Sequence, residues 1–213
     1  MARGGKSLIS LRKQPRQTRS ARLVADILEA AARVLAQEGA HRFTTGRVAE
    51  AAGVSVGSLY QYFPNKEAIL FRLQSEEWRQ TMDQLRLILG DTRSPPLERL
   101  RTAVRAFFLS ECEEAAFRTA LEEAAPLYRE APESQAHAEE GRRLMGDFMK
   151  EALPRMSARE RAFAADLVGT MMSAVGKAIS SQNRSTSEVG ALARAVSEMF
   201  CGYLERYSLR ETG

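Results

Sequence analysis

The stretch AAGVSVGSLYQYFPNKEAI (residues 51–69) holds two glycines, a proline and two tyrosines within nineteen residues. Gly53 interrupts a short helical segment, because glycine adopts the left-handed backbone that a tight turn requires. Ser55 can cap a second short helix. Pro64 disfavours helical geometry at the residue before it, so this helix must end by Phe63. Two short helices joined by a glycine turn predict a helix-turn-helix.

The segments on either side complete a three-helix unit. Upstream, apolar residues recur at helical spacing from Val24 onward and predict an amphipathic helix that Gly39 closes. Thr44 or Thr45 can cap the first helix of the motif, and Asn65 can cap a longer helix after it. The helix-turn-helix is therefore expected to pack against a helix on each side.

The remainder of the chain is also predicted to be helical. No alternating strand pattern occurs, and aromatic residues fall at helical spacing. Two capping boxes, Ser157 with Glu160 and Ser185 with Glu188, mark the starts of the last two helices. We expect an all-α fold of about nine helices.

Three segments differ in composition and predict the domain organisation. Residues 1–20 are rich in Gly, Ser, Pro, Gln and Arg and are expected to form a flexible basic arm. Residues 21–68 contain the helix-turn-helix, and residues 69–213 form a second helical domain.

Positive charge is concentrated at the N-terminal end. Residues 1–67 carry eleven Lys or Arg and five Asp or Glu, a net charge of +6, so the other 146 residues carry −2 of the total of +4. A charge confined to one end indicates a polyanionic partner there. A basic tail that only aids solubility is the alternative.

The composition argues against several other classes of protein. The two cysteines, Cys112 and Cys201, form no CxxC pair, so neither a disulfide framework nor a zinc ribbon is expected. No apolar run reaches the ~18 residues of a membrane span, because Asp166 and Lys177 interrupt the longest one. The first twenty residues lack the apolar core of a signal peptide. We expect a cytoplasmic protein without cofactor or metal.

The second helix of the motif is suited to a DNA major groove. If Leu59 points inward, the outward residues are small or polar apart from one valine: Val56, Gly57, Ser58, Tyr60 and Gln61. Such a surface enters a groove without obstruction and brings hydroxyl and amide groups to base edges or phosphates. A pair of short surface helices would not explain the basic arm that precedes them.

Residues 27–70, ILEAAARVLAQEGAHRFTTGRVAEAAGVSVGSLYQYFPNKEAIL, closely resemble the N-terminal domain of the TetR family of bacterial transcriptional regulators. The matching motifs are ILEAA, TT…VAEAAGVS and SLYQYFPNKEAIL. Members of this family are all-helical homodimers, and their variable C-terminal domain binds a small molecule that sets DNA affinity. The resemblance implies a ligand-responsive regulator, most simply a repressor that an effector releases from a pseudo-palindromic operator.

The resemblance also assigns roles to matching residues. Thr44 and Thr45 correspond to hydroxyls that touch phosphate, and Lys66 to a lysine that meets phosphate from the next helix. Tyr60 and Tyr62 would grip the DNA backbone, although Tyr62 has core packing as an alternative. The implied DNA-binding set is Thr44, Thr45, Arg47, Ser55, Val56, Gly57, Ser58, Tyr60, Gln61, Tyr62 and Lys66.

The basic arm has a possible role of its own. Some family members extend such an arm into the adjacent minor groove. Arg12, Lys13, Arg16 and Arg19 are the candidates here, because they lie closest to the first helix.

The last two helices are expected to form the dimer. Residues 163–180 are rich in Gly, Ala, Ser and Met, which allows close helix approach. The last helix carries an apolar stripe of Val189, Leu192, Val196, Met199 or Phe200, and Tyr203. Two such helices from each subunit would form a four-helix interface, and an intramolecular core is the alternative for the same pattern.

The middle helices are expected to enclose a pocket for an apolar or aromatic effector, with plain core packing as the alternative at each position. The candidate lining residues are Phe107, Phe108, Phe117, Leu121, Tyr128, His137, Met145, Phe148, Met149 and Met172.

Other functions have weaker support. An all-helical enzyme with a hydrophobic pocket needs a convergent catalytic pair, but Glu122 and Glu123 point about 100° apart on a helix. The acidic neighbours of Cys112 would raise its pKa and make it a poor nucleophile. A transcriptional activator, an effector-independent regulator, or an interaction module that has lost DNA binding are further alternatives.

Overall fold

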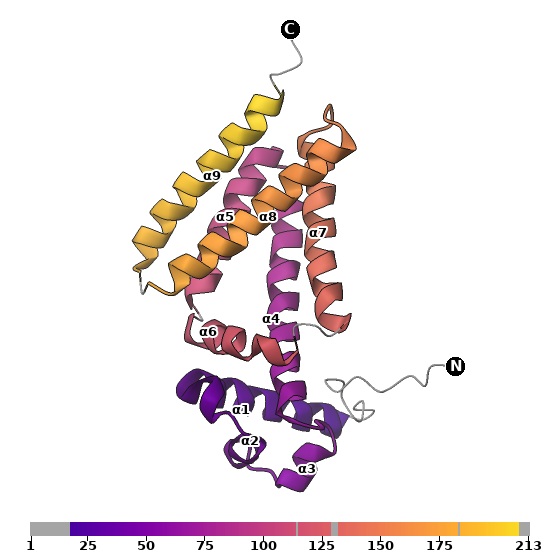
Figure 1. Ribbon diagram of the computed structural model, residues 1–213, viewed down its shortest axis with the longest axis vertical. Helices are drawn as coiled ribbons and strands as arrows, with labels where there is room; N and C mark the ends of the chain where they lie inside the picture. Colours follow the sequence, from indigo (N-terminus) through magenta and orange to yellow (C-terminus); the bar gives the residue numbers. More distant parts are fainter. Residues whose placement is uncertain (1–17, 114, 129–131, 183, 209–213) are drawn as a thin grey trace, which may run out of the picture. The chain divides into compact units, whose positions relative to one another are not determined.

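A computed structural model describes residues 18–113, 115–128, 132–182 and 184–208 (Figure 1). Within these ranges the chain forms nine α-helices and one 3-10 helix and contains no strand, so the predicted all-α fold is confirmed. In chain order the helices are α1 (Thr18–Arg42), α2 (Thr45–Ala51), α3 (Val56–Tyr60), α4 (Lys66–Leu89), α5 (Pro96–Glu113), α6 (Ala115–Ala124), the 3-10 helix η1 (Ala125–Leu127), α7 (Pro132–Ala152), α8 (Ala158–Ser180) and α9 (Thr186–Ser208).

The chain divides into two compact units. The first contains residues 1–78 together with residues 116–135, and the second contains residues 79–115 and 136–213. Helix α4 continues from the first unit into the second. The predicted domain boundary at residue 68 stays a prediction, and in the structure the segment of α6 and η1 groups with the helix-turn-helix.

The core of the first unit is formed by one face each of α1, α2, α3, the first half of α4, and α6. The apolar face of α1 is buried at helical spacing, as predicted, and includes Ile27 and Leu35. Leu121 of α6 and Tyr128 after η1 join the same cluster. The ring of Tyr128 meets that of Phe71 edge to face at 5.7 Å, so α6 and η1 contribute to the core on which the helix-turn-helix rests.

An ion pair within the first unit joins α4 to α6. Glu77 of α4 is 8% exposed, and its carboxylate contacts the guanidinium of Arg118, which is 15% exposed. Nearby, the Tyr128 hydroxyl donates to the carbonyl oxygen of Leu121 at 3.1 Å. Polar groups shielded from water need such partners, so the ion pair between Glu77 and Arg118 constrains how α6 packs against α4.

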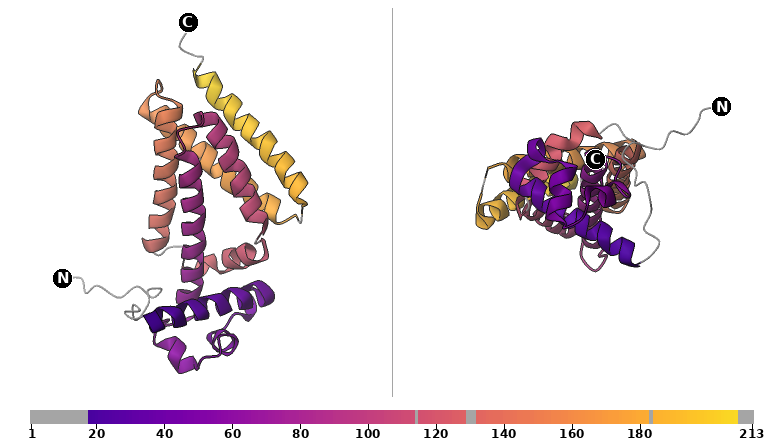
Figure 2. Two further views of the ribbon diagram at one scale, coloured as in Figure 1. Left: turned by 180° about the vertical axis from the view of Figure 1, so that it is seen from behind. Right: turned by 90° about the horizontal axis from the view of Figure 1, so that it is seen from below.

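The second unit packs α5 against α9 and α8 (Figures 1 and 2). Gly176 of α8 lies so close to Phe107 of α5 that a Cβ atom would stand 2.8 Å from the ring. Arg99, 2% exposed, pairs with Glu151 of α7 and lies 5.7 Å from the centre of the Phe148 ring. The buried guanidinium thus ties α5 to α7 at one end of the unit.

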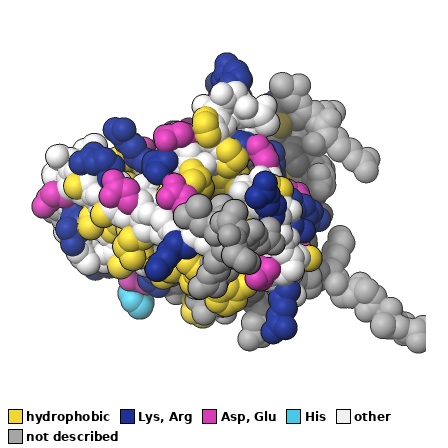
Figure 3. All heavy atoms as spheres, turned by 90° about the horizontal axis from the view of Figure 1, so that it is seen from above, with side chains coloured by type: hydrophobic (Ala, Val, Ile, Leu, Met, Phe, Trp, Pro, Cys, Tyr) yellow, Lys and Arg dark blue, Asp and Glu magenta, His cyan; other side chains and the backbone are white. Residues whose placement is uncertain are grey.

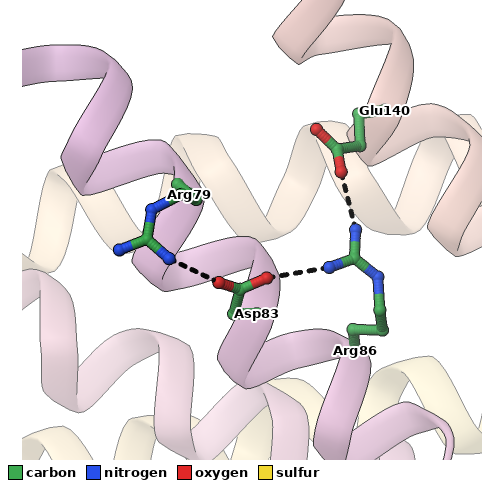
Figure 4. Close-up of polar contacts among 4 residues, drawn as sticks. All are labelled: Arg79, Asp83, Arg86 and Glu140. Carbon is green, nitrogen blue, oxygen red and sulfur yellow. Dashed lines mark hydrogen bonds and ion pairs between the residues drawn. The ribbon is translucent and has the colours of Figure 1, made fainter. Parts of the chain in front are cut away.

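A chain of surface ion pairs links α4 to α7 in the second unit (Figure 4). Asp83 contacts Arg79 at 2.9 Å and Arg86 at 2.9 Å, and Arg86 reaches Glu140 of α7 at 2.6 Å. Figure 3 shows a face of the molecule on which basic, acidic and apolar side chains are interspersed. Exposed pairs of this kind contribute little to stability individually, so packing must hold the unit together.

The predicted helix starts agree with the structure wherever a local cap defines them. Thr44 and Ser55 cap α2 and α3, and the Asn65 side chain accepts from the backbone N–H of Ala68 at 2.8 Å. Both capping boxes are present, with Glu160 and Glu188 returning to the backbone N–H of their cap residues.

Gly39 ends the regular part of α1, as predicted: its backbone is non-helical (φ +73°), and only a short helical segment follows it as far as Arg42. One local prediction needs correction. The arm was expected to extend to residue 20, yet α1 begins at Thr18, and the rest of the arm lies outside the described residues. Helix α7 begins at Pro132, and the Ser134 hydroxyl donates to the Tyr128 carbonyl.

One described helix, α8, is long and apolar enough to cross a membrane by length and composition alone. This is the segment that the charges of Asp166 and Lys177 interrupt, and one such helix is weak evidence for a membrane span. Val168 and Met172 of this helix are buried in the core of the second unit, and helices of soluble proteins meet the same criterion when they pack in this way.

The turn between α2 and α3 supplies a stability test. Gly53 is left-handed (φ +65°), so Gly53→Ala should lower the free energy of unfolding by about 1 kcal/mol. Gly46 in the first turn of α2 is the matched control, because an added Cβ there would meet only the Thr44 hydroxyl at 4.0 Å, so Gly46→Ala should be neutral or stabilising. Urea denaturation of both variants measures the difference, and equal midpoints would contradict the assigned role of Gly53.

Candidate nucleic-acid interface

The α2–turn–α3 segment has the geometry of a helix-turn-helix. Val48 and Leu59 are fully buried, and Val54 of the turn packs against the same cluster. The Gly53 amide donates to the carbonyl of Glu50, which completes the end of α2. Because Leu59 points inward, α3 turns its other face outward, as the sequence predicts.

The outward face of α3 is small and polar. Val56 is 42% exposed and Tyr60 is 38% exposed. Gly57 and Gln61 are also exposed, whereas Ser58 is partly buried. The structure therefore leaves room for a groove to approach α3, and contact with base edges stays a prediction.

Two hydrogen bonds organise the hydroxyl groups around this face. The Thr45 and Tyr60 hydroxyls lie 3.1 Å apart, so the start of α2 is joined to the end of α3. The Ser55 and Ser58 hydroxyls lie 2.8 Å apart, and Ser55 also accepts from the Ser58 backbone at 3.1 Å. The structure thus brings together residues that the family resemblance selected separately.

The cations of the predicted site are held differently. Lys66 is the first residue of α4 and is partly buried. The Arg47 backbone N–H donates to the Thr44 hydroxyl at 3.3 Å, and its guanidinium forms an ion pair with Glu38 of α1. The ion pair between Arg47 and Glu38 was not predicted. Glu38 lies nine positions before Arg47, on the other side of the left-handed Gly39, and no sequence signal links the two residues.

Tyr62 differs from the other predicted contacts. Its side chain is only 6% exposed and belongs to the core of the first unit. This burial favours the core-packing alternative over a grip on the DNA backbone.

The arm residues are described only in part. Arg12, Lys13 and Arg16 lie outside the described residues, and Arg19 is an exposed residue in the first turn of α1. A minor-groove role for these four residues stays a prediction.

The predicted pocket residues fall into two groups. Leu121 and Tyr128 are buried in the first unit, where Phe117 packs against them. His137 is a partly buried residue of α7. The remaining six lie in the core cluster of the second unit or against it: Phe107, Phe108, Met145, Phe148, Met149 and Met172. All the apolar members therefore serve as core residues in this structure.

The predicted dimer stripe also packs within its own chain. Val189 and Phe200 are buried in the core of the second unit, and Leu192, Val196 and Tyr203 pack partly against it. For Val189 and Phe200 the structure favours the intramolecular-core alternative, because α9 covers α5 with this side of the helix. Of the predicted residues only Met199 remains open, at 63% exposed.

The described side chains include no group of three or more His, Cys, Asp or Glu residues that could hold a metal ion. Burial, together with the charge of Glu111, raises the pKa of Cys112 above its ordinary value, so this thiol is a poor nucleophile, as expected. The fold and the exposed face of α3 define this chain as a protein of the helix-turn-helix class.

Comparison with known families specifies this class. A model described as bacterial regulatory proteins, tetR family, matches residues 27–73, and a model described as tetracyclin repressor-like, C-terminal domain, matches residues 95–207. The second match alone covers more than half of the chain. The chain belongs to the TetR family of transcriptional regulators.

Individual relatives align over shorter stretches. The fatty acid metabolism regulator protein of Bacillus subtilis is 39% identical over 59 residues, which are 28% of this chain and 30% of that protein. The nucleoid occlusion factor SlmA of Vibrio vulnificus is 32% identical over 106 residues, with 40% and 54% coverage. The chain thus spans between about a third and a half of these relatives.

Solved structures share the fold over most of the chain. The structure of the SmeT–triclosan complex superposes with a TM-score of 0.64 at 21% identity, covering 84% of this chain and 90% of that one.

Proposed function

We propose that this protein is a homodimeric transcriptional repressor that binds a pseudo-palindromic operator through α2 and α3 and leaves it when a small molecule binds. The observation that carries the proposal is the exposed face of α3, which consists of small and polar side chains. Beside it the hydroxyls of Thr45 and Tyr60 are hydrogen-bonded to each other. The match to a model described as tetracyclin repressor-like supports repression as the direction of regulation.

Within this proposal the contacts divide by chemistry. Hydroxyls at the start of α2 and on Tyr60, with the cation of Lys66, would bind phosphates and fix the position of the protein on the duplex. Val56, Gly57, Ser58 and Gln61 would face base edges. Basic residues of the arm would add contacts in the adjacent minor groove.

The dimer would use the faces of α8 and α9 that point away from α5. Phe163 of α8 is 60% exposed, and Met199 of α9 is similarly open. Ala195 and Ala191 are exposed about one and two turns before Met199, so a partner helix can approach closely. Two recognition helices arranged by such an interface would lie about 34–36 Å apart, or at a wider spacing of similar phase, on one side of the duplex.

The effector would bind among the aromatic and methionine side chains of the helices after α4. SmeT, the repressor of a multidrug efflux pump, was solved as a complex with triclosan. An apolar or aromatic compound is therefore the first class of effector to test. Such a ligand releases DNA only if it binds the non-DNA conformation more tightly. We expect no enzymatic activity and a cytoplasmic location.

The proposal is tested by selecting duplexes from a random-sequence library with the purified protein. We expect two related half-sites in inverted orientation at a fixed spacing. Binding without any sequence preference would contradict a specific regulator. The position of the selected site relative to the promoter separates a repressor from an activator of the same fold.

A further inference from the structure

An acidic side chain lies inside the surface proposed to meet DNA. Glu38, the residue before the left-handed Gly39, forms an ion pair with the guanidinium of Arg47 on α2. The Arg47 side chain is 46% exposed and that of Glu38 is 30% exposed. The guanidinium of Arg47 therefore remains accessible to solvent, whereas the carboxylate oxygen that it contacts is shielded from water.

The surrounding contacts hold both partners in place. Arg47 is fixed in the first turn of α2, because its backbone N–H donates to the capping hydroxyl of Thr44 at 3.3 Å. Glu38 belongs to α1, which packs against α2, and one of its carboxylate oxygens is shielded from water. A shielded charge is screened less than a freely exposed one, so its effect on a nearby phosphate persists at moderate salt.

We propose that Glu38 restrains Arg47 in the free protein and competes with DNA phosphate for its guanidinium, so that Glu38 lowers the affinity of the regulator for DNA. This inference rests on the proposed function. A phosphate that binds Arg47 must either displace the carboxylate or accept a second negative charge close to it. Both arrangements oppose binding, so the sign of the effect does not depend on which one forms.

The opposite role would be positioning. A carboxylate can hold an arginine in the orientation that a phosphate needs and so reduce the entropy lost on binding. Removal of the charge would then weaken DNA binding, whereas competition predicts that it strengthens binding. The direction of the change therefore decides between the two roles.

The experiment compares Glu38→Gln with Glu29→Gln by fluorescence anisotropy on a duplex selected with the wild-type protein. Glu29 is the matched control, because it lies on the same helix and pairs with the exposed Arg33 at 2.6 Å. Both variants remove one negative charge per subunit. We expect Glu38→Gln to bind about 3- to 10-fold more tightly and to steepen the salt dependence by about one counterion per subunit. Glu29→Gln should change affinity less than about 2-fold.

Arg47→Gln completes a double-mutant cycle with Glu38→Gln. In the Arg47→Gln background we expect the gain from Glu38→Gln to fall below about 2-fold, because no guanidinium remains to be released. Weaker or unchanged binding by Glu38→Gln, or a gain that persists without Arg47, would overturn the inference. Glu38→Ser repeats the measurement if the glutamine variant fails to fold. Salt-sensitive binding by the wild type alongside such a result would leave the proposed function intact, whereas a wild type that binds no DNA would refute both.

Discussion

Arg118→Leu should destabilise the first unit by about 3 kcal/mol, because it removes the guanidinium that compensates the buried carboxylate of Glu77. Loss of one member of a buried pair costs more than loss of an exposed pair, since the remaining charge keeps its desolvation penalty. The change should also loosen α6 from α4 and expose part of the core beneath the helix-turn-helix.

The chain contains a reporter for this effect. Trp78 is its one tryptophan, lies next to Glu77 in sequence and packs against the core of the first unit. Urea denaturation followed by tryptophan fluorescence should show an earlier transition for Arg118→Leu. Arg33→Leu is the matched control, because it breaks an exposed pair and should cost less than about 0.5 kcal/mol.

A double variant separates the charge from the packing. Replacing both Glu77 and Arg118 by methionine removes the two charges together, so stability should return to within about 1 kcal/mol of the wild type. If Arg118→Leu unfolds at the wild-type urea concentration, the buried ion pair does not hold α6 in place.

Tyr60→Ala combined with Lys66→Ala should weaken binding to a selected operator by about 100-fold or more. Each subunit loses a phenolic hydroxyl and a cation, and charge-assisted contacts with phosphate are among the stronger hydrogen bonds. Four contacts disappear from a dimer. The dependence on salt should also become shallower by about two counterions, one for each lysine removed.

The expected loss must be separated from a loss of folding. Tyr60 lies at the end of α3 with 38% of its surface exposed, and a lysine at a helix N-terminus opposes the dipole, so the variant should unfold close to the wild-type temperature. Arg72→Ala is the matched charge control, because Arg72 is exposed on α4 but lies outside the proposed contacts. Equal weakening by Arg72→Ala would show that overall charge, rather than this contact set, controls binding.

Features of the fold that depend on neighbouring residues in the sequence were predictable. Thr44 and Ser55 cap helices through contacts three residues away, and Gly53 supplies a backbone conformation that few other residues adopt. These local rules, with the position of Leu59, establish the helix-turn-helix and the face that it turns outward.

Features that depend on distant parts of the chain were not predictable. Val189 and Phe200 have the spacing of an interface stripe, but the same spacing suits a core, and only the position of α5 decides between them. Glu38 and Arg47 pair across a left-handed turn. Glu77 and Arg118, which pair between α4 and α6, are 41 positions apart in the sequence. Periodicity describes one helix at a time and carries no information on such partners.

The central claim is that this chain binds a specific DNA duplex through the helix-turn-helix, and salt dependence tests it most directly. The wild-type protein would be titrated against its selected duplex by fluorescence anisotropy at several salt concentrations between 50 and 200 mM, with a scrambled duplex of equal length alongside. We expect tight binding to the selected duplex, with the logarithm of affinity falling against the logarithm of salt with a slope of about −4 or steeper. A flat response, or equal affinity for the scrambled duplex, would contradict the claim.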